Sequence, residues 1–177
     1  MSLRKFADPI APAEAKDGPA RSDDSPAFER PELRALLELW RSKAAGGVPA
    51  RSAFDMRALK AFAPHVMIME CEGEGPQRRY KFRLFGSALQ MLFGEHTGRY
   101  LDEMVSPALL PGWRAVCDDV VAARRPLRIV THFCLPSQHL LRGEFLMAPM
   151  TDAEGALRMI LAATYVGRRD VVHAPFG

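Results

Sequence analysis

The sequence has few cysteines, no cluster of basic residues and no long apolar run. Its three cysteines, Cys71, Cys117 and Cys134, include no C-x-x-C pair. An odd number of cysteines beside apolar segments predicts reduced core thiols in a cytosolic protein rather than a disulfide framework. The 24 lysines and arginines are scattered among 21 acids, and a nucleic-acid site needs clustered basic residues. We therefore expect a cytoplasmic protein that neither binds nucleic acid nor inserts into a membrane.

Recognisable metal-binding and catalytic patterns are also absent. His65, His132 and His139 lack the H-x-x-x-H or mixed Cys/His spacing of zinc sites. The acids Glu70 and Glu144 do not form a recognisable acid/base pair. The sequence therefore predicts no metal, no cofactor and no enzymatic activity, and leaves a small-molecule ligand open.

Length and composition divide the 177 residues into one domain and its flanking segments. Residues 1–28 are rich in proline, alanine and aspartate without an apolar period, which predicts a flexible tail. Residues 29–64 form a predicted helical segment, residues 65–167 the main domain, and residues 168–177 a C-terminal tail.

An amphipathic helix is predicted from Pro31 to Ala44, because four large apolar side chains recur there at helical spacing: Leu33, Leu36, Leu37 and Trp40. An exposed stripe of this kind is costly, so something must cover it. The helix either folds back on its own domain, which we favour, or contacts a partner. In the second case these four residues are the candidate partner or homodimer interface.

Five later segments are predicted as strands. VMIMEC after His65 and RRYKFRLF flank the turn-rich EGEGPQ, which predicts a hairpin in which Tyr80, Phe82 and Leu84 share one face. The segments PLRIVTHFCL, HLLRGEFLMAPM and ALRMILAATYV close the chain. Hairpin connections at both ends of the sheet predict antiparallel pairing.

Three helical segments separate the first two strands from the last three. Ser87 and Gln90 form a candidate capping box for a helix that ends at Gly94. A single turn is predicted from Tyr100 to Val105, and Ser106-Pro107 opens a longer helix. The fold class is therefore α+β, a five-stranded antiparallel sheet covered on one face by helices, with the amphipathic helix N-terminal to it.

This order of elements, together with three local words, resembles a bacterial family of compact, single-domain PAS-like proteins. The words are VPARSAFDM, YKFRLFGSALQMLFGEHTGRYLDEM and APMTDAEGALRMILAATYV, and the resemblance covers Leu33 to Val166. Arg83, Gly86, Gly94 and Gly98 occupy its motif positions. The glycines are interpreted as conformational rather than phosphate-binding, because their spacing is not the dinucleotide fingerprint.

The resemblance implies a cavity between the sheet and the helices. The candidate cavity or ligand residues are Arg83, Phe93, His96, Trp113, Phe133 and Phe145. Two alternatives stay open: the apolar members pack as an ordinary core, and Arg83 pairs with a nearby acid such as Asp102, Glu103 or Glu144.

The resemblance implies a stand-alone sensory or adaptor protein that contacts regulatory signalling proteins, with a small ligand in its cavity as a modulator. One alternative is a haem-type sensor ligated by His96, although the long helix, the usual place for such a ligand, has no histidine from Ala108 to Arg125. A flavin photosensor is not expected, because EHTGRYLDEM lacks the reactive cysteine. A second alternative is a cone-shaped α+β enzyme resembling ketosteroid isomerases.

Overall fold

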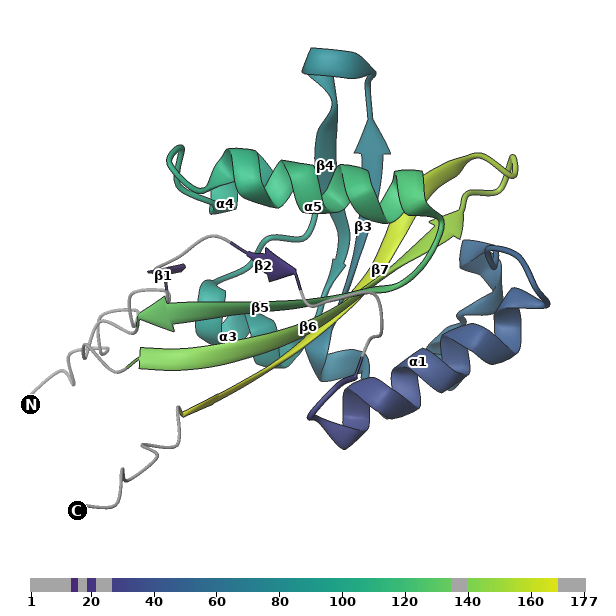
Figure 1. The fold of residues 1–177 in the computed structure, drawn as a ribbon, viewed down its shortest axis with the longest axis horizontal. Helices are drawn as coiled ribbons and strands as arrows, with labels where there is room; N and C mark the ends of the chain where they lie inside the picture. Colours follow the sequence, from purple (N-terminus) through teal and green to yellow (C-terminus); the bar gives the residue numbers. More distant parts are fainter. Residues whose placement is uncertain (1–13, 16–18, 22–26, 135–139, 169–177) are drawn as a thin grey trace, which may run out of the picture.

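The computed structural model describes residues 14–15, 19–21, 27–134 and 140–168. Its centre is an antiparallel sheet in which the five main strands follow the order β5-β6-β7-β3-β4 (Figure 1). These strands are β3 (Val66–Glu72), β4 (Arg79–Phe85), β5 (Leu127–Cys134), β6 (Leu140–Thr151) and β7 (Leu157–Arg168). The predicted fold class, an α+β protein with a five-stranded antiparallel sheet, is confirmed.

Two further strands of two residues each lie along β5. β1 (Glu14–Ala15) and β2 (Ala20–Arg21) both pair antiparallel with it. They fall within residues 1–28, predicted as a flexible tail. Most of that segment, and residues 169–177, lie outside the described residues, so the two tails stay predictions.

The connection between β4 and β5 supplies the helices that cover one face of the sheet. They are α3 (Ser87–Phe93), α4 (Leu101–Met104) and α5 (Leu110–Ala123), and α5 crosses that face (Figure 1). Trp113, Val116, Cys117 and Val120 of α5 are buried against the sheet. The long helix begins later than Ser106-Pro107, because the carbonyl of Ser106 first closes a separate turn with the N–H of Leu109.

The predicted capping box at Ser87 and Gln90 is wrong. Gly86 occupies the N-cap position of α3, and Ser87 is already the first helical residue. The Gln90 amide instead donates a hydrogen bond to the carbonyl of Phe85, at 2.8 Å. Gly94 ends the helix as expected, with φ of +85°.

A β-bulge between β3 and β4 changes which side chains of β4 share a face. Ile68 lies opposite Leu84 and Met69 lies opposite Phe82, so Arg83 is an extra residue without a partner on β3. One extra residue shifts the alternation of side chains by one position. Leu84 therefore packs on the α1 side of the sheet, not with Phe82 as the regular alternation predicted.

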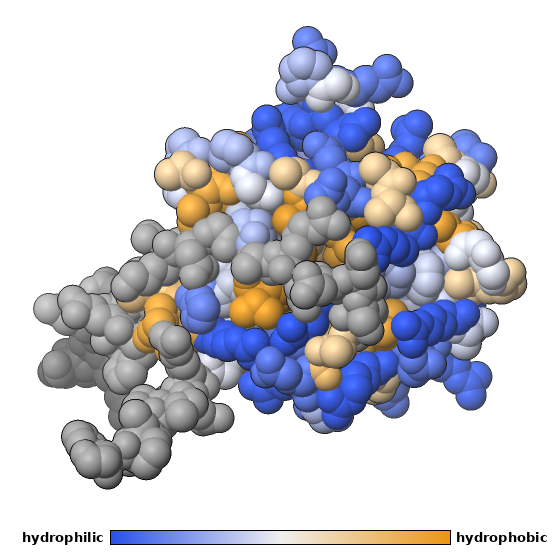
Figure 2. All heavy atoms as spheres, in the orientation of Figure 1, coloured by the Kyte–Doolittle hydropathy of each residue, from blue (hydrophilic) through white to orange (hydrophobic). Residues whose placement is uncertain are grey.

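The opposite face of the sheet is covered by α1 (Pro31–Ala44), which confirms the predicted helix and its bounds. The outward side of α1 is mostly hydrophilic (Figure 2), as expected for an amphipathic helix that buries one stripe. The chain then passes through η1 (Arg51–Ala53), α2 (Met56–Leu59) and η2 (Ala63–His65) to β3. The short 3₁₀ turn η3 (Gly75–Gln77) joins β3 to β4.

A buried carboxylate on β6 holds the start of α1 against the sheet. Glu144 accepts hydrogen bonds from the backbone N–H groups of Glu29 and Arg30, each at 2.9 Å. The Arg128 guanidinium of β5 also bonds Glu144 and lies 2.9 Å from the Glu29 carboxylate. A buried charge is tolerated only when it is paired and hydrogen-bonded, and here both conditions are met.

Among the described residues, no helix combines the length and the apolar character needed to cross a membrane.

Candidate functional site

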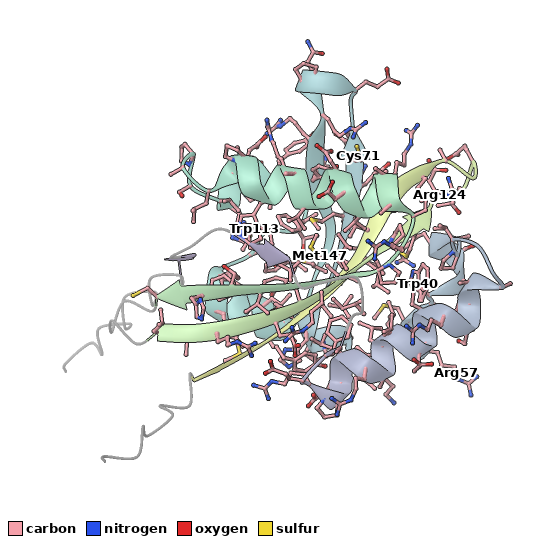
Figure 3. The ribbon with its side chains drawn as sticks, in the orientation of Figure 1. Trp40, Arg57, Cys71, Trp113, Arg124 and Met147 are labelled. Carbon is pink, nitrogen blue, oxygen red and sulfur yellow. The ribbon has the colours of Figure 1, made fainter. Side chains whose placement is uncertain are left out.

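A cavity of about 740 Å³ lies between the sheet and the helices α3, α4 and α5, within the volume range of small-molecule sites. The sheet contributes aromatic and methionine side chains to its wall: Met67, Met69, Phe82, Phe133, Phe145 and Met147. The helices contribute Phe93, Leu101, Trp113 and Cys117. Trp113 and Met147 lie in the layer between α5 and the strands (Figure 3).

Five of the six predicted cavity residues line this space: Phe93, His96, Trp113, Phe133 and Phe145. Their rings contact one another across the wall. The centroids of Phe93 and Phe133 lie 4.9 Å apart, and those of Trp113 and Phe145 lie 5.3 Å apart, which is the usual range for paired aromatic rings. The cavity therefore has a contiguous aromatic wall formed by two helices and two strands.

Arg83, the sixth predicted residue, does not line the cavity. As the bulged residue of β4, it points to the acids of the neighbouring strand, where its guanidinium bonds Glu70 and lies 3.1 Å from Glu72. The alternative that Arg83 pairs with acids is therefore the observed one. The partners differ from Asp102, Glu103 and Glu144, because the sequence did not reveal the bulge.

His96 is buried, with 8% of its surface exposed, in the loop between α3 and α4. Its Nε2 lies 2.9 Å from the carbonyl oxygen of Phe93. A carbonyl only accepts, so Nε2 carries the proton and Nδ1 of the neutral ring presents a lone pair. Within the described part of the chain, Nδ1 is buried and has no hydrogen-bond partner.

Trp113 presents a second buried nitrogen. The side chain is 6% exposed, and its Nε1–H finds no acceptor among the described residues. Buried indole N–H groups usually have a partner, since leaving one unsatisfied is unfavourable. The cavity wall thus carries one unpartnered acceptor, at His96, and one unpartnered donor, at Trp113.

The cavity opens to the surface along the chain from Glu95 to Pro107. Five members of the lining in this segment are exposed: Glu95, Arg99, Glu103, Ser106 and Pro107. The single turn of α4 forms part of this rim, so access to the interior depends on how firmly α4 is held.

Ion pairs and hydrogen bonds hold α4 in place. Asp102 accepts from Nε of Arg79 at 2.7 Å and lies 3.3 Å from the guanidinium of Arg114 on α5. The hydrogen bond from Arg79 is the main reason that the pKa of Asp102 lies below its ordinary value. The backbone N–H of Tyr100 donates to Glu103 at 2.7 Å, which completes the first turn of the helix.

The sequence analysis missed the sulfur-bearing part of the wall. Met67 and Met69 alternate in β3 and therefore share its cavity face, a signal that the pattern VMIMEC contained. Cys117 was assigned to the core, and burial raises the pKa of its thiol strongly. A thiol held protonated in this way is inert, because the thiolate is the reactive form.

The predicted interface residues of α1 lie elsewhere and are not exposed. Leu33, Leu36, Leu37 and Trp40 are all buried in the layer between α1 and the sheet. Trp40 also donates its indole N–H to the carbonyl of Pro149, at 2.9 Å. Of the two alternatives, the fold-back on the chain's own sheet is the observed one; contact with a partner through this stripe would require α1 to leave the sheet.

No group of three or more His, Cys, Asp or Glu side chains in the described ranges is placed to hold a metal ion.

Comparisons with known proteins give one family and a distant structural likeness. A family model described as a PAS domain matches residues 28–164. Among solved structures, the chain is similar to one titled "Structure of an RNA-binding Light-Oxygen-Voltage Receptor", with 14% sequence identity and a TM-score of 0.42. That likeness covers 86% of this chain and 39% of the other, so this chain spans well under half of that protein's length. No curated protein matches the sequence.

Proposed function

This chain belongs to the PAS domain family, a general sensory and signalling fold, and on that premise we propose that it is a sensory and adaptor module. In this proposal a small molecule occupies the cavity between the sheet and α3–α5, and binding changes the affinity of the surface for regulatory signalling proteins. A ligand changes such an affinity only when it binds the two conformations unequally.

The observation that carries the proposal is the cavity itself. A space of about 740 Å³ is large for a protein interior, because interiors are close-packed and rarely keep voids larger than a water molecule. The two unpartnered nitrogens in its wall, at His96 and Trp113, support a ligand with polar atoms.

The proposal includes no catalytic step. The three carboxylates of the lining are engaged within the chain: Glu95 with the N–H of Thr97, Asp102 with Arg79, and Glu103 with the N–H of Tyr100. Glu144, the buried carboxylate that an isomerase-like enzyme would need, lies outside the lining and already accepts two backbone N–H groups. A binding role accounts for these acids better than acid/base chemistry does.

The proposal is tested by filling the cavity and comparing partners. Ala162 of β7 is buried and lines the cavity, so Ala162→Leu places a larger side chain inside it. Ala115→Leu makes the same change on the exposed side of α5 and serves as the matched control. Tagged forms of both variants and of the unaltered protein are purified from the native host, and co-purifying proteins are quantified.

We expect specific partners whose recovery changes with Ala162→Leu and not with Ala115→Leu. Equal recovery in all three preparations would argue against coupling between cavity and surface. The absence of any specific partner would argue against the adaptor role as a whole.

A second candidate function, a haem-type sensor, is supported by the geometry of His96. Metal-ligating histidines usually donate their other ring N–H to a carbonyl or carboxylate, and the bond to Phe93 follows that pattern. The lining offers only one guanidinium, Arg99, for the carboxylates of such a group. Protein purified from its host with haem supplied, and showing no absorbance beyond the aromatic band, would exclude this candidate.

A further inference from the structure

We infer that the cavity selects an uncharged, largely apolar molecule that accepts a hydrogen bond from Trp113 Nε1–H or donates one to His96 Nδ1, and a ligand with both groups satisfies both nitrogens. This inference deepens the proposed function and rests on it for the role of the cavity. It follows from the chemistry of the described residues in the cavity wall.

The apolar part of the ligand is specified by the interior of the cavity. Phe93, Phe133, Phe145 and Trp113 form the contiguous aromatic wall, and methionines such as Met147 complete it. Methionine side chains adapt to irregular shapes and pack favourably against rings. A molecule with aromatic or other apolar surface is therefore stabilised over most of its area.

The polar groups of the ligand are specified by the two buried nitrogens. Trp113 Nε1 can only donate, so it calls for an acceptor on the ligand. His96 is held by its bond to Phe93 in the form whose Nδ1 accepts, so it calls for a donor. Sites with buried polar groups discriminate against analogues that leave those groups unpaired.

The absence of charge is specified by the lining acids and bases. Among the described residues of the lining, the acids Glu95, Asp102 and Glu103 outnumber the single guanidinium, Arg99. Arg99 lies 3.7 Å from Glu103 and is therefore already paired. An anion would lose its hydration and meet a net negative surround, which is unfavourable. The carboxylates are hydrogen-bonded within the chain, so a cation would find no free counter-charge.

The test uses five naphthalenes of similar size that differ in one substituent. 2-Methylnaphthalene has no hydrogen-bonding group, 2-methoxynaphthalene only accepts, and 2-naphthol donates and accepts. 2-Naphthoate is the anionic probe and 2-(aminomethyl)naphthalene the cationic probe. Affinities are measured at neutral pH by equilibrium dialysis against the full chain and against two variants, Trp113→Phe and His96→Phe.

For the unaltered protein we expect 2-naphthol to bind most tightly, followed by the methoxy and then the methyl compound. Each step is about threefold to tenfold, the contribution of one net hydrogen bond. Trp113→Phe should abolish the preference for methoxy over methyl. His96→Phe should abolish the preference for hydroxyl over methoxy. Both charged probes should bind at least about tenfold more weakly than 2-naphthol.

The comparison within each variant keeps the test valid if a substitution lowers stability, because the ratio of two affinities does not depend on the folded fraction of the preparation. Equal affinities of the three neutral probes in the unaltered protein would overturn the role of the two nitrogens. Tighter binding of either charged probe would overturn the assignment of an uncharged ligand.

Failure of all five probes to bind would overturn the inference as a whole. That result would leave the adaptor role to be decided by the partner comparison with Ala162→Leu, which uses no added ligand. The two proposals therefore fail in distinguishable ways.

Discussion

Trp40 of α1 donates its indole N–H to the carbonyl oxygen of Pro149 on β6, at 2.9 Å. This bond joins two residues that are 109 positions apart in the sequence and lies in the buried layer between the helix and the sheet (Figure 3). The same residue had been assigned to a partner interface by its apolar spacing alone. Its bond and its burial make α1 an integral layer of the domain.

The first prediction concerns the contribution of Trp40 to folding. Trp40→Ala removes the buried ring and its hydrogen bond, and should lower the free energy of unfolding by about 3–5 kcal/mol. Lys43→Ala, at an exposed position of the same helix, should change it by less than about 0.5 kcal/mol. Urea unfolding followed by circular dichroism measures both. Equal effects of the two substitutions would contradict the packing of α1 on the sheet.

The second prediction concerns Gly86, a motif position that the sequence analysis interpreted as conformational. Its φ is −66°, an ordinary value, so the requirement for glycine is one of space. A Cβ atom there would lie about 2.5 Å from the carbonyl oxygen of Ala63 and nearer still to that of Pro64. Gly86→Ala should therefore destabilise the protein by about 2–3 kcal/mol.

Gly47→Ala is the matched control, since a Cβ there would lie 3.7 Å from the nearest atom, an ordinary contact. Thermal unfolding of the two variants should separate them clearly. A neutral Gly86→Ala would show that η2 can move away from the start of α3.

Most of the sheet was predictable because each strand carries a local signal. The alternation in β5 and the turn residues between β6 and β7 specify pairings between neighbours in sequence. The bulge at Arg83 was not predictable, because a single sequence does not show where a strand gains an extra residue. That one residue exchanges the faces of Leu84 and Phe85 and removes Arg83 from the cavity.

The aromatic residues of the cavity were predictable to the extent that they are apolar and lie on elements facing the same layer. Whether that layer is filled or hollow depends on the combined volume of side chains from six or more elements, which no local pattern reports. The unpartnered nitrogens of His96 and Trp113 likewise appear only once the neighbouring groups are placed in space.

A third prediction concerns Glu144, whose side chain is 2% exposed. Glu144→Gln retains the shape and removes the charge that Arg128 and two backbone N–H groups share. Breaking a buried pair in this way should cost about 3 kcal/mol. Hydrogen exchange at the N–H groups of Glu29 and Arg30 should accelerate as well. Glu154→Gln, at an exposed position, should leave both measurements unchanged.

The last prediction concerns the rim of the cavity and its dependence on pH. The pKa of Asp102 is lowered, first by its hydrogen bond from Arg79, so its ionised form is favoured in the folded protein. The stabilisation is therefore present above the pKa that Asp102 has when unfolded, and it is lost as the pH falls through the lower, folded pKa. Asp102→Asn should lower the free energy of unfolding at pH 7. The difference from the unaltered protein should shrink as the pH falls below 3.8, the ordinary value for this group.

Because Asp102 also holds α4 at the mouth of the cavity, Asp102→Asn should accelerate hydrogen exchange in α4 at pH 7, while exchange in α1 on the other face stays unchanged. Glu38→Gln, which alters an exposed ion pair on α1, is the control for the loss of one charge. A difference in unfolding free energy that is constant from pH 7 to pH 3 would contradict the assignment, because a group that titrates must lose its contribution once it is protonated in both states.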